Sequence, residues 1–452
     1  IAGNPSILLF ITFIGGFIEM FKASSATRAL EQYAMKNIDS RKKALTLTWV
    51  SSFGFLYTEP SAIVGFIVRP ITDKFKIPRV KLAYITDSMG CTLASISPIS
   101  PHGSFILGLI AIQMAELGIP GDPWEYFFRL IPFNLYAILS MLTSLYVIRT
   151  DLDIGPMYEA EVRAATTGEE IGPDDKPMIS DTEENDSFKD KDVPMKNFFI
   201  PLLSMIVAIF LVIFWSGDIG SNGFIGAFQN ANVMLAITIG VLTATIIAGI
   251  IGIVSKFLDF NTASDTLMKG YSQIMMVLVI LVLAWSIGSV TKAMGLQEFL
   301  INFIERFQLA KIVPAFIFLI GCLIAFATGS SWGVFAIMIP IAIPVAHSTG
   351  IDLLLTTGAA ISGGLFGDHC SPISDTTIMA SASAACDHFE HVKTQLPYAL
   401  TIAIAIFIGY LVAGLLNMPI ASIIVAVVIL SIELKLLNKY AKNKYGVLSD
   451  SK

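Results

Sequence analysis

The sequence predicts an all-α polytopic membrane protein. Hydrophobic residues make up 54% of the 452-residue chain, charged residues only 14%, and the mean hydropathy is +0.72. Many apolar runs reach the roughly 20 residues that a helix needs to cross a bilayer. Several of these runs are interrupted by polar residues, glycine and proline. Backbone freed by such breaks is tolerated at membrane depth only against protein or water, so the breaks predict buried polar sites.

The most polar interruption lies between the apolar runs 353–366 and 397–416. Ser371-Pro372 is expected to break the helix there, because proline lacks an N–H and clashes with the preceding turn. Asp368 and Asp375 stand beside this break among small hydroxyl residues. Ionisable residues at this depth are costly and by default mark an ion or substrate pathway. Their oxygens suit a hard cation better than a transition metal, although a kinked structural helix is the alternative interpretation.

The first half of the chain, 1–148, is expected to form one structural repeat. Its elements are a hydrophobic helix 5–22, an amphipathic stretch 23–41, an interrupted segment 44–68, a broken helix 79–116 and a span 127–148. Basic residues flank segment 44–68, so both of its ends should be cytoplasmic. Its 25 residues are too few to cross a core of about 30 Å twice. We therefore expect a re-entrant hairpin with Thr58, Glu59 and Ser61 at its tip.

The segment 149–197 divides the two halves and carries a net charge of −8, which leaves about +2 for the rest of the chain. It contains fourteen Asp and Glu against six Lys and Arg, whereas the whole chain has a net charge of −6. This composition, with few aromatic residues, predicts a solvated and mostly disordered cytoplasmic loop.

The second half, 198–416, repeats the order of the first. Spans at 198–216, 232–254 and 271–292 precede an amphipathic stretch 293–310, an interrupted hairpin 312–346, a broken segment 352–388 and a span 397–416. A final helix and a lysine-rich tail occupy 417–452, which the positive charge places in the cytoplasm. Counting crossings gives the two halves opposite orientations, which is the inverted-repeat architecture of secondary transporters. The first half lacks counterparts of 198–216 and 232–254, and we expect these upstream of Ile1.

One long motif resembles a known family. The string Gly367-Asp-His-Cys-Ser-Pro-Ile-Ser-Asp-Thr-Thr377, followed by Cys386-Asp-His388 and Thr394-Gln-Leu-Pro-Tyr-Ala399, is similar to the signature of NhaC-type sodium/proton antiporters of the ion-transporter superfamily. The stretch from Arg69 to Ser88 looks like its counterpart in the first half. The resemblance implies a homodimer in which a transport domain of hairpins and broken helices slides against a scaffold, an elevator-type mechanism.

The first half departs from this family at the tip of its hairpin. Relatives commonly carry paired acidic residues there, whereas this chain has Leu56-Tyr57 and a single nearby carboxylate, Glu59. This departure weakens the expectation of simple sodium/proton exchange, since the family also includes carriers of organic acids and amino acids.

The candidate cation and substrate ligands come from all four interruptions. They are Thr58, Glu59, Ser61, Asp87, Ser88, Ser97, Thr328, Gly329, Ser330, Ser331, Asp368, His369, Ser371, Ser374, Asp375, Thr376 and Thr377. Within this set we expect Na⁺ at Asp368, Ser371, Asp375 and Thr376. Na⁺ is thus a coupling ion, and no cofactor is expected.

Two mechanisms follow from these ligands. In the first, Asp368 and Asp375 bind Na⁺ when ionised and release it when protonated, which gives Na⁺/H⁺ antiport at the membrane midplane between the broken helices. In the second, Na⁺ is a co-ion and half-helix N-termini receive the carboxylate of an amino acid or small organic acid. Metal or hydrolase chemistry at His388 and His391 is the competing class, and we expect a transporter and no enzyme.

The cysteines and the distribution of charge indicate the expected partners and location of the protein. The four cysteines lie in apolar segments and are expected to be small core residues rather than disulfides. No extended basic surface suggests nucleic acid. The expected partners are Na⁺, H⁺, a small organic solute under the second mechanism, and the lipid bilayer of a bacterial plasma membrane, with the C-terminus in the cytoplasm.

Overall fold

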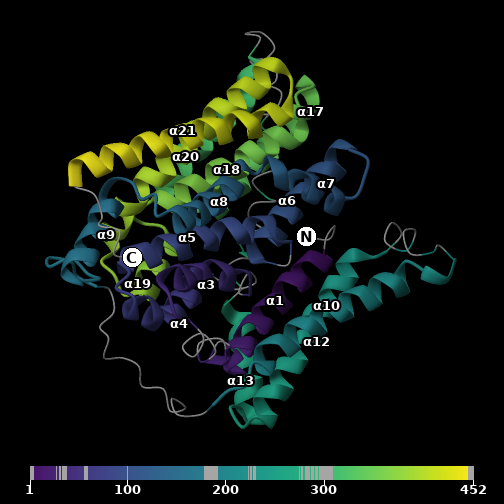
Figure 1. The fold of residues 1–452 in the computed structure, drawn as a ribbon. Coiled ribbons are helices and arrows are strands. Elements are labelled where there is room, and N and C mark those ends of the chain that lie inside the picture. The colour runs from purple at the N-terminus through teal and green to yellow at the C-terminus, as the bar shows by residue number, and fades with distance from the viewer. Residues whose placement is uncertain are drawn as a thin grey trace. The chain divides into compact units, whose positions relative to one another are not determined.

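The computed structural model describes residues 5–26, 38–54, 60–98, 100–177, 192–221, 231–273 and 309–445, with the single residues 28, 29, 32, 223, 227, 275, 278, 279, 286, 290 and 294. All regular secondary structure in these residues is helical (Figure 1). The chain divides into two compact units: 1–37, 99–104 and 185–282 form the first, and 38–98, 105–184 and 283–452 form the second. The predicted boundaries of the repeats remain a prediction.

In its described residues, the first unit contains three apolar helices and one more polar helix, α13 (Phe260–Gln273). The apolar helices are α1 (Pro5–Ala23), α10 (Lys196–Ser216) and α12 (Val233–Val254). Helix α1 packs against α12 and α13, and α10 packs against α12. Glu19, the acidic residue of α1, is buried and pairs with Lys22 at 3.1 Å and Lys269 at 3.0 Å. Its charge is therefore compensated within this unit.

The second unit begins with the segment that we expect to be a re-entrant hairpin. Helices α3 (Arg41–Gly54) and α4 (Pro60–Lys74) pack against each other, as a hairpin requires. The broken helix that follows consists of α5 (Arg79–Ile96) and α6 (Pro101–Leu117), of which residues 101–104 belong to the first unit. The helical break thus falls within the Ser- and Pro-rich stretch 95–104, as predicted from its prolines.

The next span is shorter than the sequence predicts. Helix α7 (Pro123–Leu130) leads into a 3₁₀ turn, η1 (Ile131–Phe133), and α8 (Leu135–Thr150) starts only after it. Pro132 lies within the turn and has no N–H to donate to a continuing α-helix, which explains the late start of α8.

Part of the acidic segment is ordered, in contrast to the expectation of a mostly disordered loop. Helix α9 (Gly155–Thr167) buries Met157, Tyr158 and Ala164 and packs against α5, α20 and α21. Burial of the periodic apolar residues on this helix offsets the conformational entropy that the segment loses when it becomes ordered. The acidic residues of the segment would not offset this loss by themselves.

The segments expected to form the second hairpin and the second broken helix are helical. The elements are η2 (Ala310–Ile312), α16 (Val313–Thr328), α17 (Ser331–Thr349), α18 (Leu353–Cys370), α19 (Asp375–Ala384), α20 (His388–Leu416) and α21 (Pro419–Tyr445). Gly329, at a φ of +65°, caps α16 and separates the two arms of the hairpin. Pro372 separates α18 from α19.

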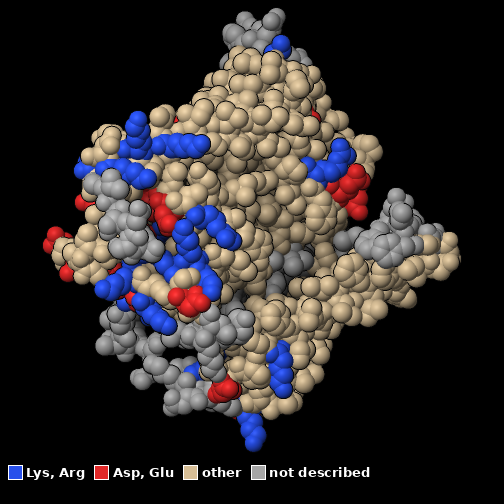
Figure 2. All heavy atoms as spheres, viewed as in Figure 1, with Lys and Arg blue, Asp and Glu red and all other residues tan. Residues whose placement is uncertain are grey.

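Eight helical segments in the described part of the chain are long and apolar enough to cross a membrane. They are Arg79–Leu117, Leu135–Thr167, Lys196–Ser216, Leu235–Val254, Ala310–Thr328, Ser331–Thr349, His388–Leu416 and Pro419–Tyr445. In the second unit, Figure 2 shows a broad area without charged side chains around α18 and α20, and Lys and Arg grouped near α9. This distribution is typical of a multi-pass membrane protein.

Candidate ion-binding site

Asp368 lies where two helices of the second unit begin. It occupies the last turn of α18 and is almost completely buried. Ser331, the first residue of α17, donates to its Oδ2 at 2.6 Å, and Ser374, the N-cap of α19, donates to its Oδ1 at 2.7 Å. Helix N-termini carry partial positive charge, so both helices favour a negative group at this position.

Glycines bring the hairpin close enough to support this arrangement. A Cβ on Gly367 would lie 2.3 Å from the Cβ of Ala325 and 2.4 Å from the backbone nitrogen of Phe326, both in α16. Gly363 would similarly meet the carbonyl oxygen of Phe318 at 2.4 Å. Only glycine at these positions allows α16 and α18 to approach this closely.

The second carboxylate of the site is Asp87, in the middle of α5. Its side chain is completely buried, and both of its described hydrogen bonds reach the same oxygen. Gln395 Nε2 donates to Oδ2 at 2.6 Å, and the hydroxyl of Thr377 donates to Oδ2 at 3.0 Å. Oδ1 is buried without a hydrogen-bond partner among the described residues. A buried acceptor in this state is costly unless a further group satisfies it.

The two carboxylates share their neighbours. The Thr377 hydroxyl that contacts Asp87 also lies 3.4 Å from the backbone carbonyl oxygen of Asp368. Gln395 donates both to Asp87 and to the carbonyl oxygen of His369. Asp87 from α5 and Asp368 from α18 are therefore parts of one buried polar cluster, which also includes α17, α19 and α20.

His391 orients Gln395 in this cluster. Because Gln395 Nε2 faces two acceptors, its Oε1 must receive the hydrogen bond from His391 Nε2, at 2.9 Å. The Nε2 atom of His391 lies 4.0 Å from Asp87 Oδ2, and its Nδ1 lies 2.8 Å from the hydroxyl of Ser381. This chain of contacts fixes which oxygen of Asp87 is satisfied and which is left free.

His369 makes a second contact with α5 and connects the cluster to one further helix, α8. Its Nε2 lies 3.1 Å from the hydroxyl of Ser88 on α5, and its Nδ1 lies 2.7 Å from the hydroxyl of Tyr136 on α8. Both ring nitrogens thus have partners, which holds the ring in one orientation.

The predicted site residues divide between this cluster and its surroundings. Those inside it are Asp87, Ser88, Ser331, Asp368, His369, Ser374, Thr376 and Thr377, all of which are buried. Thr376 contacts the hydroxyl of Ser374 at 3.0 Å. Of the other predicted Na⁺ ligands, Ser371 donates to the carbonyl oxygen of Phe326 at 2.9 Å, and Asp375 is exposed.

Four other predicted residues lie at the helix breaks. Thr328 is exposed and bonds to the carbonyl oxygen of Ile324 in its own helix. Gly329 lies against the break between α18 and α19, since a Cβ there would be 2.7 Å from the carbonyl oxygen of Ile373. Ser97 and Ser330 are half-buried at the end of α5 and the start of α17. Thr58, Glu59 and the side chain of Ser61 lie outside the described residues.

Sequence reasoning missed Gln395, His391, Ser381 and Tyr136 as members of the cluster. Gln395 follows His391 by four residues on a helix that continues as a membrane span, so both polar groups face the same side. Two polar residues at this spacing beside an apolar run are a signal that could have identified them.

The ligand chemistry of the cluster consists mainly of carboxylate, hydroxyl and amide oxygens. Neither Asp87 nor Asp368 forms an ion pair with Lys or Arg in the described part of the chain. Within that part, no group of three or more His, Cys, Asp or Glu residues could hold a metal ion. Two uncompensated carboxylates among hydroxyls suit a monovalent hard cation.

Comparison with known proteins places this cluster in context. The sequence model of the Na⁺/H⁺ antiporter family matches residues 90–415. An uncharacterised protein of Haemophilus influenzae is 32% identical over 92% of this chain and 79% of its own. A malate-2H⁺/Na⁺-lactate antiporter of Bacillus subtilis is 28% identical over 40% of this chain and 39% of its own. The Na⁺/H⁺ antiporter NhaC of the same organism is 42% identical over 14% of this chain and 15% of its own.

Solved structures show the same fold at low sequence identity. The YdaH transporter of Alcanivorax borkumensis has a TM-score of 0.61 and 12% identity, over 94% of this chain and 84% of its own. MtrF of Neisseria gonorrhoeae has a TM-score of 0.53 and 13% identity, over 94% of this chain and 80% of its own. These similarities show a shared helical fold. Because the family model covers most of the chain and includes Asp368 and Gln395, the protein belongs to the Na⁺/H⁺ antiporter family.

Proposed function

We propose that this antiporter exchanges Na⁺ for H⁺ at one site between Asp87 and Asp368. The observation that carries the proposal is the free Oδ1 of Asp87, which is buried beside a carboxylate that already receives two hydroxyl hydrogen bonds. Na⁺ bound here would satisfy this oxygen and offset the charge of both carboxylates. The hydroxyls of Ser331, Ser374 and Thr377 supply further oxygens, as a hard cation prefers.

The exchange follows from competition for the same negative charge. The ionised pair attracts Na⁺, because two buried carboxylates without a cation are costly. Protonation removes charge from the pair and releases Na⁺ on the side to which the site is open. Since the site accepts either Na⁺ or H⁺, each transport cycle exchanges one for the other. Asp375, which is exposed, and Ser371, which donates to the carbonyl oxygen of Phe326, do not bind Na⁺ directly in this mechanism, although the sequence suggests both as ligands.

A reconstitution experiment tests this function. The purified protein in liposomes, given an inward Na⁺ gradient, should drive H⁺ outward and raise the internal pH without any added solute. Asp87→Asn and Asp368→Asn should each abolish this signal, whereas Asp174→Asn, on the exposed acidic segment, should retain it. Full Na⁺-driven proton movement in both site variants would refute the proposal.

A second function is favoured by the names of two relatives. One relative exchanges malate and H⁺ for Na⁺ and lactate, and an arginine/ornithine antiporter of Halobacterium salinarum is 29% identical over 35% of this chain. Na⁺-coupled transport of a small organic acid or amino acid would use the same carboxylates. Adding malate, lactate, arginine or ornithine to the liposome assay separates the two functions: a signal that requires one of these solutes favours the second.

Three further properties remain proposals. The elevator-type movement and the homodimer are supported by family membership and by the hairpins beside each broken helix. A cytoplasmic C-terminus is supported by Lys435, Lys439, Lys442 and Lys444 on α21. Labelling of a cysteine introduced at Lys444 by a membrane-impermeant reagent, in intact cells and after lysis, tests this orientation.

A further inference from the structure

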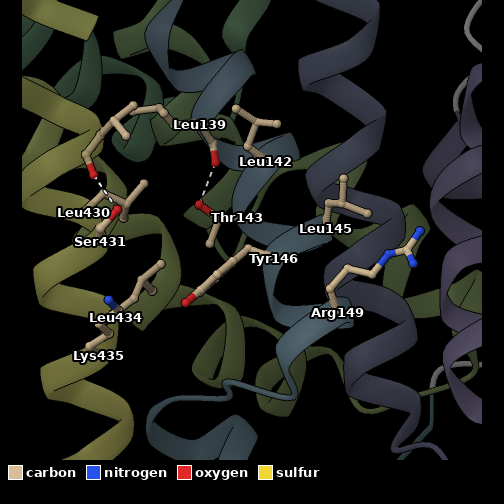
Figure 3. Close-up of a pocket in the computed structure, with 11 residues that line it drawn as sticks. Leu139, Leu142, Thr143, Leu145, Tyr146, Arg149, Leu430, Ser431, Leu434 and Lys435 are labelled. Atoms are coloured by element: carbon tan, nitrogen blue, oxygen red, sulfur yellow. Dashed lines mark hydrogen bonds between the residues drawn. The ribbon is translucent and has the colours of Figure 1, made fainter. Parts of the chain in front are cut away.

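A groove runs along the second unit between α8 and α21, and we call it the α8–α21 groove (Figure 3). It encloses about 580 Å³, within the range of roughly 300–1,000 Å³ that is typical of ligand sites. Its floor is formed by buried Leu139, Leu430 and Leu434, and its rim by exposed Leu142. Helix α20 packs against both helices that form the groove.

The polar groups inside the groove are already satisfied by their own helices. Thr143 donates to the carbonyl oxygen of Leu139 at 2.6 Å, and Ser431 donates to that of Val427 at 2.7 Å (Figure 3). Neither hydroxyl hydrogen is therefore available to an occupant. Between Leu139 and Leu145 the surface of the groove is apolar, so the part of an occupant that lies there must also be apolar.

Positive charge gathers at one end of the groove. Arg149 and Lys435, both exposed, line one end of the groove: Arg149 follows Leu145 by four residues on α8, and Lys435 directly follows Leu434 on α21. In Figure 3 the guanidinium of Arg149 extends away from α21. Tyr146 lies at the same end, and its hydroxyl points towards α21. The Nζ of Lys42 lies 3.3 Å from the backbone oxygen of Arg149, but it pairs with Asp151 at 3.0 Å, so its charge is already compensated.

The dimensions match one leaflet of a membrane. Ten residues separate Leu139 from Arg149, which corresponds to about 15 Å of helix. This is half the thickness of a hydrocarbon core of about 30 Å. Long basic side chains and a tyrosine at the end of an apolar surface are the residues found at the level of lipid headgroups.

We propose that the α8–α21 groove binds one anionic phospholipid of the leaflet that faces Arg149 and Lys435. Its acyl chain lies on Leu139, Leu142 and Leu430, and its phosphate lies at the basic end near Tyr146. The cationic end selects the headgroup, since each Lys or Arg near an anionic lipid favours it about fivefold. This lipid would bind beside α8, the helix whose Tyr136 holds His369 in the ion site.

Native mass spectrometry of the full chain in detergent tests this proposal. The probes are dioctanoyl phosphatidylglycerol, dioctanoyl phosphatidylcholine and inorganic phosphate. We expect the wild-type protein to bind phosphatidylglycerol at least tenfold more tightly than phosphatidylcholine, and inorganic phosphate not to compete. The double variant Arg149→Gln/Lys435→Gln should lose this preference, and Leu142→Trp, which fills the groove, should weaken binding of both lipids.

The control is Lys444→Gln, which removes one charge from the opposite side of α21 and should keep the wild-type preference. Equal binding of phosphatidylglycerol by the wild type and the double variant would overturn the proposal, as would competition by inorganic phosphate alone. Conversion of a dimer to a monomer by Leu142→Trp, with phosphatidylglycerol adducts unchanged, would overturn it in favour of a second copy of the chain as the occupant.

Discussion

Gln395 binds Asp87 through one carboxylate oxygen only, with Nε2 of Gln395 at 2.6 Å from Oδ2 of Asp87. The other oxygen, Oδ1, is left buried and without a partner among the described residues. The Gln395 amide therefore not only donates to the Asp87 carboxylate but also determines that Oδ1 is the oxygen left to bind an ion. The contact crosses from α20 to α5, two helices that are distant in sequence.

Replacing Gln395 should weaken Na⁺ binding without abolishing the site. In Gln395→Ala, Asp87 loses a hydrogen bond to a charged group, worth about 1.5–3 kcal/mol, and can rotate away from its present position. We expect the Na⁺ concentration at half-maximal exchange to rise about tenfold or more in liposomes. The control is Thr394→Val, because the Thr394 hydroxyl bonds only to its own helix, at Glu390 and His391. Unchanged half-saturation in Gln395→Ala would contradict this role.

Two aspartates seven residues apart should respond differently to the same change. Asp368 is buried and receives hydrogen bonds from Ser331 and Ser374, whereas Asp375 is exposed at the start of α19. We expect Asp375→Asn to retain most of the Na⁺-driven pH signal and Asp368→Asn to lose it. Expression and thermal stability of both variants should be compared first. Loss of exchange in both would place Asp375 among the ligands, as the sequence suggests.

The sequence was sufficient to predict the helix breaks around the site. Ser371-Pro372 and Gly329 act locally, through a missing N–H and a left-handed φ, so their effect does not depend on the rest of the fold. Asp368, Ser374 and Thr377 were predicted for the same reason, since polar residues at a break in an apolar run can be recognised from neighbours in the chain.

The partners of these residues could not be predicted in the same way. Gln395 and Tyr136 reach the cluster only through the packing of α20 and α8, and sequence spacing does not specify which helices pack together. Helix α9 was missed because the acidic composition of segment 149–197 predicts disorder. The sequence does not show that Asp153 and Glu161 of this segment are compensated by a lysine on α5.

That lysine, Lys81, should be important for stability. Its Nζ lies 2.8 Å from Asp153 Oδ2 and 2.8 Å from Glu161 Oε1, and all three side chains are completely buried. Lys81→Met leaves Glu161 paired with Arg41. It leaves Asp153 with a hydrogen bond from Tyr398 but no ion pair among the described residues, so we expect a loss of about 3–5 kcal/mol, measured by denaturation in detergent. Lys42→Met breaks an exposed pair with Asp151 and should cost about 0–1 kcal/mol. Similar losses in both variants would contradict the prediction.

Adding one methyl group behind Asp368 should disrupt the site. In Gly367→Ala the new Cβ would lie 2.3 Å from the Cβ of Ala325, so α16 and α18 must move apart. We expect lower thermal stability and loss of Na⁺/H⁺ exchange. Gly333 is the matched control, because nothing lies within 4 Å of a Cβ there. Gly333→Ala should be neutral or stabilising by about 0.5–1 kcal/mol, since alanine favours the helix. Normal exchange in Gly367→Ala would show that the helices tolerate separation.

The start of α20 should give the protein an acid-sensitive contact outside the membrane spans. Asp387 Oδ1 accepts from the backbone N–H groups of Phe389 and Glu390, and Oδ2 accepts from Lys176 N at 2.9 Å. Burial alone would raise the pKa of Asp387, but these N–H donors and the nearby His388 hold its pKa below the usual value of 3.8. Since the folded pKa is depressed, the stabilisation is present above about pH 4 and disappears as the pH falls through the folded pKa.

Thermal unfolding in detergent between about pH 6 and pH 2 should show this loss in the wild type. Asp387→Asn keeps an acceptor at the N-cap and should flatten the acid dependence while retaining most of the stability at pH 6, whereas Asp387→Ala should lose about 0.5–2 kcal/mol at pH 6. An unchanged acid dependence in both variants would show that a different carboxylate controls it.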